Sequence, residues 1–165
     1  MVLNKFGDSN AVEYIVKEFK YQYLVVISQD CDLDQYDNIV QGKYQNAFLP
    51  HILLLPAFSE NYYRDGIVYK DMYNVEQEPK PKKLLDKIKD NKEDRYFSLR
   101  ECKSLGIDNT YIIDFKSYIT IPYTSIVEQY KQTYKATINS IFRENLSRKF
   151  TTYLSRIALP EIEDC

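Results

Sequence analysis

The sequence predicts an α+β fold: a curled, mainly antiparallel sheet or partly open small barrel of five to six strands, covered by C-terminal helices. Three observations predict it. Apolar, β-branched runs occupy the first third of the chain, strand-like runs alternate with turn residues over 95–121, and apolar residues recur at helical spacing over 138–157. With 165 residues, 44% of them apolar, the chain can bury one core, and we expect a single domain over 1–165.

The first strands are predicted at 12–19, where apolar and charged residues nearly alternate, and at 21–28, which is mostly apolar. The polar stretch 29–45 predicts a loop, and the apolar run 47–56 predicts the next strand. Pro50 lies in that run and cannot donate a ladder hydrogen bond. We therefore expect a sheet edge, or a bulge near the start of this strand.

Residues 59–93 are predicted to form a charged, tyrosine-rich insertion instead of a second domain, because they hold too few large aliphatic residues for a separate core. Within this insertion, 78–83 is typical of an extended connector. The spacing of Leu84, Leu85 and Ile88 predicts a short amphipathic helix after it.

Three further strands are predicted at 95–99, 110–115 and 118–121, arranged as an antiparallel meander. Beyond Pro122 the hydroxyls of 123–125 can cap a helix, and the chain is expected to be helical from there to Pro160. One face of the last helix should pack on the sheet through Ile138, Phe142, Leu146, Phe150, Tyr153, Leu154 and Ile157.

Charge and cysteine usage limit the function classes. The 24 acids and 22 bases give a net charge of −2, so no overall field drives binding to nucleic acid or acidic membranes. Three separated cysteines and an N-terminus without a signal-like apolar stretch favour a cytoplasmic protein with free thiols. The apolar run 48–58 is interrupted by prolines and is shorter than the ~20 residues of a membrane helix, so no membrane association is expected.

The segment 28–38 carries four acids and no base directly after a predicted strand, and Asp30, Cys31 and Asp32 are our catalytic candidates there. A calcium loop would need glycine and glutamate where Gln35 and Gln41 stand. An Asp-x-Asp after a strand could hold magnesium, but no Gly-rich phosphate loop accompanies it and no cofactor is predicted. A single histidine and unpaired cysteines disfavour zinc.

A catalytic thiolate at Cys31 would require a lowered pKa, and the neighbouring carboxylates act in the opposite direction. The alternative is structural: Cys31 is a small buried residue, while Asp30 and Asp32 cap a turn by accepting from backbone N–H groups.

Two other candidates lie in or beside predicted strands. His51 is a binding candidate, although a lone histidine in an apolar run is more often a hydrogen-bonded core residue. Arg95 could clamp a phosphate or carboxylate with two hydrogen bonds, or pair with Asp94 or the acidic segment.

The C-terminal helices are the basic end of the molecule, since 131–156 holds six bases and one acid, a local charge of +5. Arg148, Thr152 and Arg156 recur every four residues and could form an anion- or RNA-binding face. A solvated helix face is the favoured interpretation.

The order of elements resembles the PemK/MazF-like small-barrel toxins, through Gly7-Asp8, the strand 24–28 and the run 52–56. Separately, the closing segment 150–160 resembles uncharacterised bacterial proteins, some of them near defence genes. The PemK/MazF-like resemblance implies a small barrel and a bacterial toxin–antitoxin setting. Those toxins cut RNA with an arginine before the Val-x-Ser-like strand and a threonine or serine after a later one. Here 20–23 reads Lys-Tyr-Gln-Tyr, so the catalytic arginine has no counterpart.

We therefore predict a non-catalytic binding or accessory subunit with a protein partner or a second copy of itself. Sixteen tyrosines and no tryptophan agree with an interface-forming protein. The alternatives are a divergent barrel ribonuclease or metal-assisted hydrolase using the Asp30-Cys31-Asp32 segment, and nucleic-acid binding through the basic helix.

Overall fold

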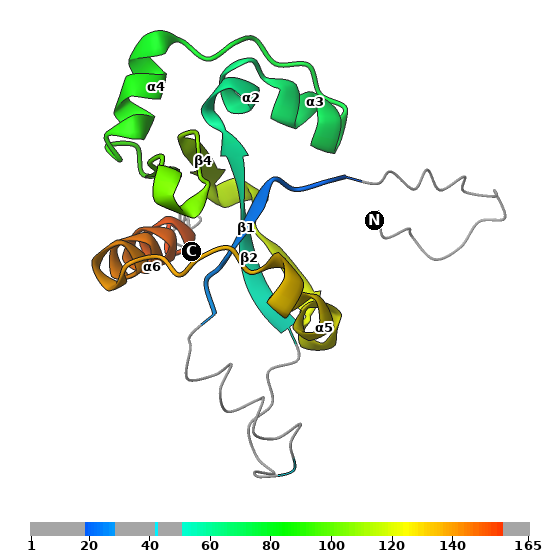
Figure 1. Ribbon diagram of the computed structural model, residues 1–165. Coiled ribbons are helices and arrows are strands. Elements are labelled where there is room, and N and C mark those ends of the chain that lie inside the picture. The colour runs from blue at the N-terminus through cyan, green and yellow to red at the C-terminus, as the bar shows by residue number, and fades with distance from the viewer. Residues whose placement is uncertain (1–18, 29–41, 43–50, 157–165) are drawn as a thin grey trace, which may run out of the picture.

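The computed structural model describes residues 19–28, 42 and 51–156, without the side chains of 127–131. It has an α+β architecture in which a five-stranded antiparallel sheet, not closed into a barrel, is flanked by helices (Figure 1). The predicted fold class is confirmed. The predicted strand at 12–19, the loop at 29–45 and Pro50 lie almost entirely outside the described residues.

The sheet is built around the long strand β2 (His51–Ser59). On one side β2 pairs with β1 (Tyr23–Val26), and on the other side β5 (Ile119–Pro122) and β4 (Tyr111–Asp114) share its length. Strand β3 (Tyr96–Leu99) pairs with β4 and completes the sheet. Of the two alternatives, the sheet edge was wrong because β2 is the central strand, and a bulge at Pro50 lies outside the described residues.

Pro56 is tolerated inside this central strand because of where its missing N–H falls. Backbone groups alternate sides along a strand, and Glu60 donates to the carbonyl of Thr110 next to β4 at 2.9 Å. Pro56, four residues earlier, faces the same side. On that side of β2, the pairing with β5 ends at Leu54 and the pairing with β4 begins at Ala57, so Pro56 falls in the gap between them. The proline therefore interrupts no ladder.

The predicted meander over 95–121 is only partly correct. β3 and β4 form an antiparallel hairpin, but β5 pairs with β2. The short 3-10 turn η2 (Phe115–Ser117) redirects the chain between β4 and β5. Asp114 starts this turn by accepting a hydrogen bond from the backbone N–H of Lys116 at 3.0 Å.

Helices surround the sheet in two groups. The short helices α2 (Glu60–Arg64), α3 (Ile67–Tyr73) and α4 (Lys82–Lys89) gather at one end, and the insertion therefore holds two helices that the sequence analysis did not predict (Figure 1). The predicted helix around residues 84–88 is confirmed as α4. The C-terminal helices are α5 (Tyr123–Thr133) and α6 (Ser140–Leu154), separated by residues 134–139.

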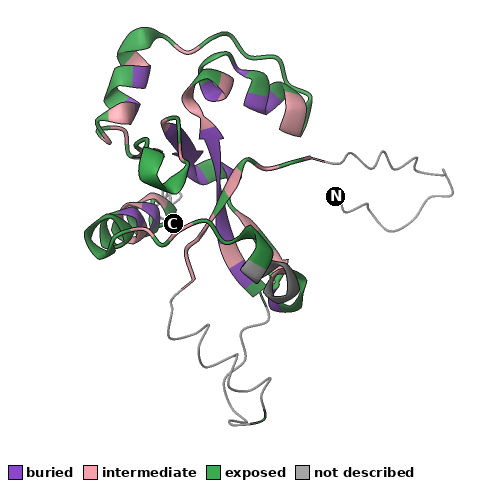
Figure 2. Cartoon of the chain, in the orientation of Figure 1, coloured by how far each residue is buried: buried purple, intermediate pink, exposed green. Residues whose placement is uncertain are grey.

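Two main hydrophobic clusters lie against the sheet, because side chains alternate along β3 and β4. Phe97 and Ile113 pack with Leu146 and Phe150 of α6. Their neighbours Tyr96 and Ile112 belong to the second cluster, which the helices of the insertion complete through Tyr63, Val68, Tyr69, Leu85 and Ile88. Buried positions accordingly line the strands and the inner sides of these helices (Figure 2).

The apolar stripe predicted for the last helix is buried at its centre only. Leu146 and Phe150 are buried, whereas Phe142 and Leu154 are exposed. None of the helices in the described part of the chain is long and apolar enough to cross a membrane.

Candidate functional site

The predicted acidic site cannot be placed, because Asp30, Cys31 and Asp32 lie outside the described residues. Their role stays a prediction. Of the four catalytic candidates, the structure positions only Arg95, which directly precedes β3.

Arg95 clamps a carboxylate of its own chain. Its Nε donates to Oδ1 of Asp114 at 2.7 Å, and its Nη2 donates to Oδ2. Asp114 ends β4 and is 2% exposed, while the side chain of Arg95 is 32% exposed. The sequence left open whether Arg95 binds a carboxylate at two points or pairs with Asp94. In the structure it binds Asp114 at two points, while the carboxylate of Asp94 accepts from Arg156.

Two buried tyrosines extend this ion pair into the insertion. The hydroxyl of Tyr69 on α3 donates to Oδ2 of Asp114 at 2.7 Å and accepts from Nη2 of Arg95 at 3.1 Å. The hydroxyl of Tyr63 on α2 lies 2.9 Å from that of Tyr69. Burial raises the pKa of both phenols, and the charge of Asp114 raises it further, so both stay protonated.

The ring of Tyr96 completes the group, with the Arg95 guanidinium 5.0 Å from its centroid. We call Tyr63, Tyr69, Arg95, Tyr96 and Asp114 the Arg95 cluster. It joins α2 and α3 to β3 and β4, and so ties the insertion to the sheet.

Every acceptor position of the buried carboxylate is in use. Oδ1 of Asp114 accepts from Arg95 and from the backbone of Lys116, and Oδ2 accepts from Arg95 and Tyr69. A carboxylate with four donors has no lone pair left for a substrate proton. This acid is therefore suited to holding the fold together and not to general-base catalysis.

The sequence analysis missed Asp114, although a signal was present. Asp114 follows three apolar residues in the strand 111–114, and an acid in a buried strand requires a charged or hydrogen-bonding partner. The partner could not be inferred, because Arg95 is 19 residues away and Tyr69 is 45.

Lys80 approaches the cluster from the connector between α3 and α4. Its Nζ lies 5.0 Å from the ring centroid of Tyr69 and 6.0 Å from that of Tyr63. The backbone N–H of Lys80 donates to the carbonyl of Arg64 at 2.8 Å, which holds the connector in place. Burial lowers the pKa of Lys80, and the charge of Arg95 lowers it further.

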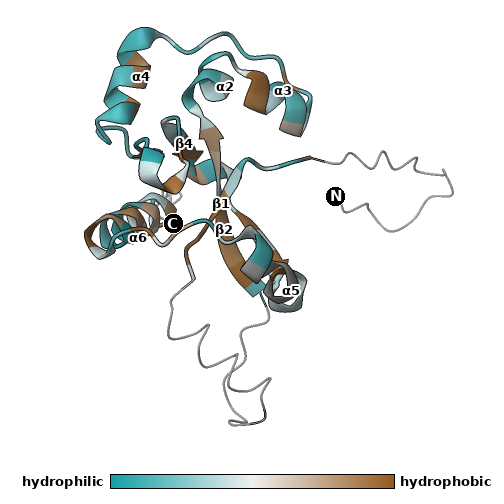
Figure 3. Ribbon diagram, viewed as in Figure 1, coloured by the Kyte–Doolittle hydropathy of each residue, from teal (hydrophilic) through white to brown (hydrophobic). Residues whose placement is uncertain are grey.

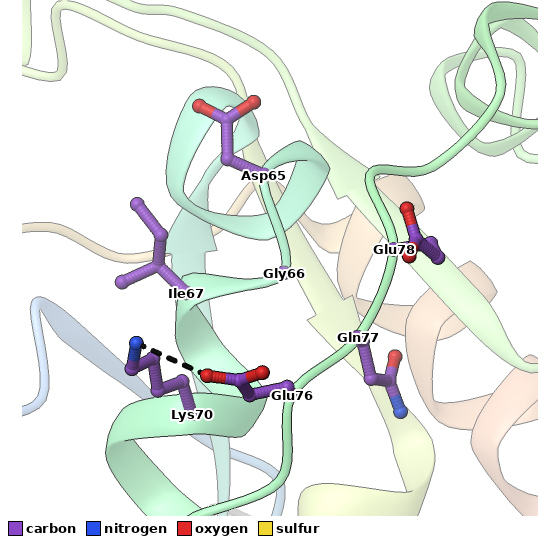
Figure 4. Close-up of a pocket in the computed structure, with 7 residues that line it drawn as sticks. All are labelled: Asp65, Gly66, Ile67, Lys70, Glu76, Gln77 and Glu78. Atoms are coloured by element: carbon purple, nitrogen blue, oxygen red, sulfur yellow. Dashed lines mark hydrogen bonds and ion pairs between the residues drawn. The ribbon is translucent and has the colours of Figure 1, made fainter.

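A shallow cavity of about 400 Å³ lies between the α2–α3 turn and the connector (Figure 4). Three of its charged side chains pair with neighbours: Asp65 accepts from Arg64 at 2.8 Å, and Lys70 lies 3.5 Å from Glu76. In Figure 4 the side chains of Asp65 and Glu78 diverge and do not point to a common centre. The side chains that line this cavity therefore do not converge as catalytic or ligand-binding groups would.

A second cavity, of about 300 Å³, lies where α4 ends beside β3, and its lining includes Ser98, Arg100 and Thr110. The hydroxyl of Ser98 is buried and has no hydrogen-bond partner among the described residues. The backbone N–H of Ser98 donates to the Asn91 side-chain carbonyl at 2.7 Å, on the side of β3 that faces away from β4. Asn91 thereby caps the outer edge of β3.

The binding candidates of the sequence analysis lie on the surface. His51 begins β2 and is exposed, so the expectation of a core histidine was wrong. Arg148 and Thr152 are exposed on α6, and Arg156 follows just after it. Nη2 of Arg148 donates to Asn145 at 2.9 Å, while Arg156 pairs with Asp94. Within the described part of the chain, no hydrogen bond or ion pair joins Arg148, Thr152 or Arg156 to the Arg95 cluster.

Large apolar side chains are exposed at the start of α6. Ile141 is 74% exposed and Phe142 is 56% exposed, the two highest values among the large apolar residues described. Figure 3 shows this end of α6 as hydrophobic although it lies at the surface. Arg143 and Arg148 follow on the same helix.

Among the residues that the structure describes, no three histidine, cysteine or acidic side chains are grouped closely enough to hold a metal ion. Cys102 is a free thiol, with its Sγ 3.3 Å from the hydroxyl of Ser104. Comparisons with protein-family models, curated proteins and solved structures gave no match.

Proposed function

We propose that this protein is a non-catalytic binding subunit that holds an acidic partner protein against the first turns of α6. The observation that supports this most strongly is the exposure of Ile141 and Phe142, at 74% and 56%. Large apolar side chains that gather on a surface mark an interaction site. Residues 139–145, which include the first turn of α6, are all exposed.

Charge supports an acidic partner. The segment 131–156 carries six bases and one acid, whereas the whole chain has a net charge of −2. Arg148 is exposed one turn beyond Glu144 and can contact a carboxylate on a partner. Apolar anchors beside charged residues are the usual composition of a protein interface.

The Arg95 cluster also fits a binding protein better than an enzyme. Its buried carboxylate is saturated with donors, and Tyr63 and Tyr69 are hydrogen-bonded within the cluster. The resemblances to PemK/MazF-like toxins and to bacterial proteins near defence genes add a proposed setting, a bacterial toxin–antitoxin or phage-defence assembly in the cytoplasm.

The proposal is tested by light scattering, to see whether the protein self-associates, and by affinity capture from its host, followed by binding measurements with the purified partner. Ile141→Asp should weaken that binding at least about tenfold, because it places a charge in an apolar contact. Ile67→Asp is the matched control, since Ile67 is an exposed isoleucine on α3. A strictly monomeric protein without a partner, or equal weakening by both variants, would contradict the proposal.

Two other results would favour the alternatives. Growth arrest on expression that Asp30→Ala or Asp32→Ala relieves would favour a ribonuclease or metal-assisted hydrolase. Binding to RNA with a steep salt dependence, flattened by Arg148→Glu together with Arg156→Glu, would favour a nucleic-acid surface.

A further inference from the structure

We propose that Lys80 and Arg95 form a binding site for a small oxyanion, a carboxylate or a phosphate group, at the edge of the Arg95 cluster. The site is separate from α6 and goes beyond the proposed function. It would take a small acidic ligand and not a macromolecule.

The charges around Tyr69 are not balanced. Lys80 and Arg95 both lie against Tyr69, with the Lys80 Nζ 5.0 Å from its ring centroid and the Arg95 Nη2 3.1 Å from its hydroxyl. The cluster holds one carboxylate, that of Asp114, and Arg95 is bound to it at two points. Two cations therefore share one anion.

Lys80 itself has no carboxylate partner in the described part of the chain. Its Nζ donates to the neutral side-chain oxygen of Gln77 at 2.8 Å. Burial and the charge of Arg95 lower the pKa of Lys80, and the charge of Asp114 raises it by less. An added anion would offset the repulsion from Arg95.

Both Arg95 and Lys80 have N–H groups that no described residue accepts from. The bonds of Arg95 to Asp114 and Tyr69 use Nε and Nη2, and no described residue accepts from Nη1. Lys80 uses one of its three ammonium hydrogens for Gln77. Two N–H groups on each side chain can thus be offered to an oxyanion.

The donors of both cations are held by neighbouring groups. The Lys80 backbone is fixed by its N–H bond to the Arg64 carbonyl and its Nζ by the bond to Gln77, while the guanidinium is fixed by Asp114 and the Tyr96 ring. Fixed donors lose little conformational entropy when a ligand binds. The exposed acids Glu76 and Glu78, on the same connector, disfavour long polyanions such as nucleic acids.

The test is a titration of the full chain with inorganic phosphate and, separately, with acetate, followed by NMR signals of the Lys80 side chain. We expect saturable shifts and a rise in the pKa of Lys80 as either anion binds. Lys80→Met should weaken binding at least about tenfold, and Lys80→Arg should retain it, because arginine keeps the charge and its contact with the rings.

Lys83→Met is the matched control, because Lys83 is an exposed lysine three positions further along the chain. It should leave the affinity unchanged. The proposal is overturned if neither anion gives saturable shifts, or if Lys80→Met and Lys83→Met bind equally. Circular dichroism of each variant shows whether any loss of binding comes from unfolding.

Discussion

At the scale of single residues, the buried carboxylate of Asp114 requires hydrogen-bond donors from three other parts of the chain. A carboxylate that is 2% exposed is tolerated only with a full set of donors, and Arg95, Tyr69 and the Lys116 backbone supply them. The sequence analysis chose Arg95 as a candidate because arginine binds carboxylates at two points. It could not identify the acceptor, since contacts between distant positions leave no local pattern.

Asp114→Asn tests this dependence. The amide removes the negative charge, so a partly buried guanidinium loses its counter-charge, and an NH2 group replaces one acceptor oxygen and faces other donors. We expect the free energy of unfolding to fall by about 3–5 kcal/mol. Urea denaturation monitored by circular dichroism measures the change.

The control is Asp65→Asn, which breaks a pair between exposed side chains, Arg64 and Asp65. An exposed pair contributes about 1 kcal/mol or less. Similar losses for the two variants would show that the burial of Asp114 is not what makes its ion pair important.

At the scale of the elements, local patterns predicted those with strong periodicity or continuous apolar runs. The strands at 23–26, 96–99 and 111–114 and the helix α4 all lie where the sequence analysis expected them. Helices α2 and α3 were missed because they have five and seven residues, too short for a periodic apolar face to be recognised. Their tyrosines among charges gave no helical signal, and tertiary packing stabilises them.

The turn between α2 and α3 depends on Gly66. Its φ is +72°, and a Cβ there would lie 2.6 Å from the backbone oxygen of Gln77 on the connector. We expect Gly66→Ala to lower the free energy of unfolding by more than the roughly 1–2 kcal/mol of left-handed strain alone, because the connector must also move. Thermal unfolding monitored by circular dichroism measures this.

Gly106→Ala separates the two contributions. Gly106 has a similar φ of +65°, but its nearest neighbour is the flexible end of the Lys135 side chain, at 3.1 Å. This variant should show the backbone strain alone. Equal losses for both glycines would mean that the contact with Gln77 does not restrain the connector.

At the scale of the whole molecule, the two main clusters share one sheet. The sequence analysis counted too few aliphatic residues in 59–93 for a separate core, and the insertion indeed packs on Phe58 and Ile112 of the sheet. The contribution of tyrosine to the core was underestimated, because Tyr63 and Tyr69 are buried in positions that aliphatic residues usually occupy. Local sequence patterns could not predict which strand β5 pairs with, because that choice depends on the direction in which η2 turns the chain.

Shared strands predict cooperative unfolding. Tyr96 and Phe97 are adjacent in β3 but belong to different clusters. If β3 detaches from the sheet, both clusters are therefore exposed together. We expect hydrogen exchange of the amides in α4 and in β4 to report the same free energy of opening. Ile88→Ala, which truncates a fully buried side chain on α4, should lower both values by about 2–5 kcal/mol. If only the α4 amides exchange faster, the insertion unfolds as a separate unit, and the Arg95 cluster does not couple it to the sheet.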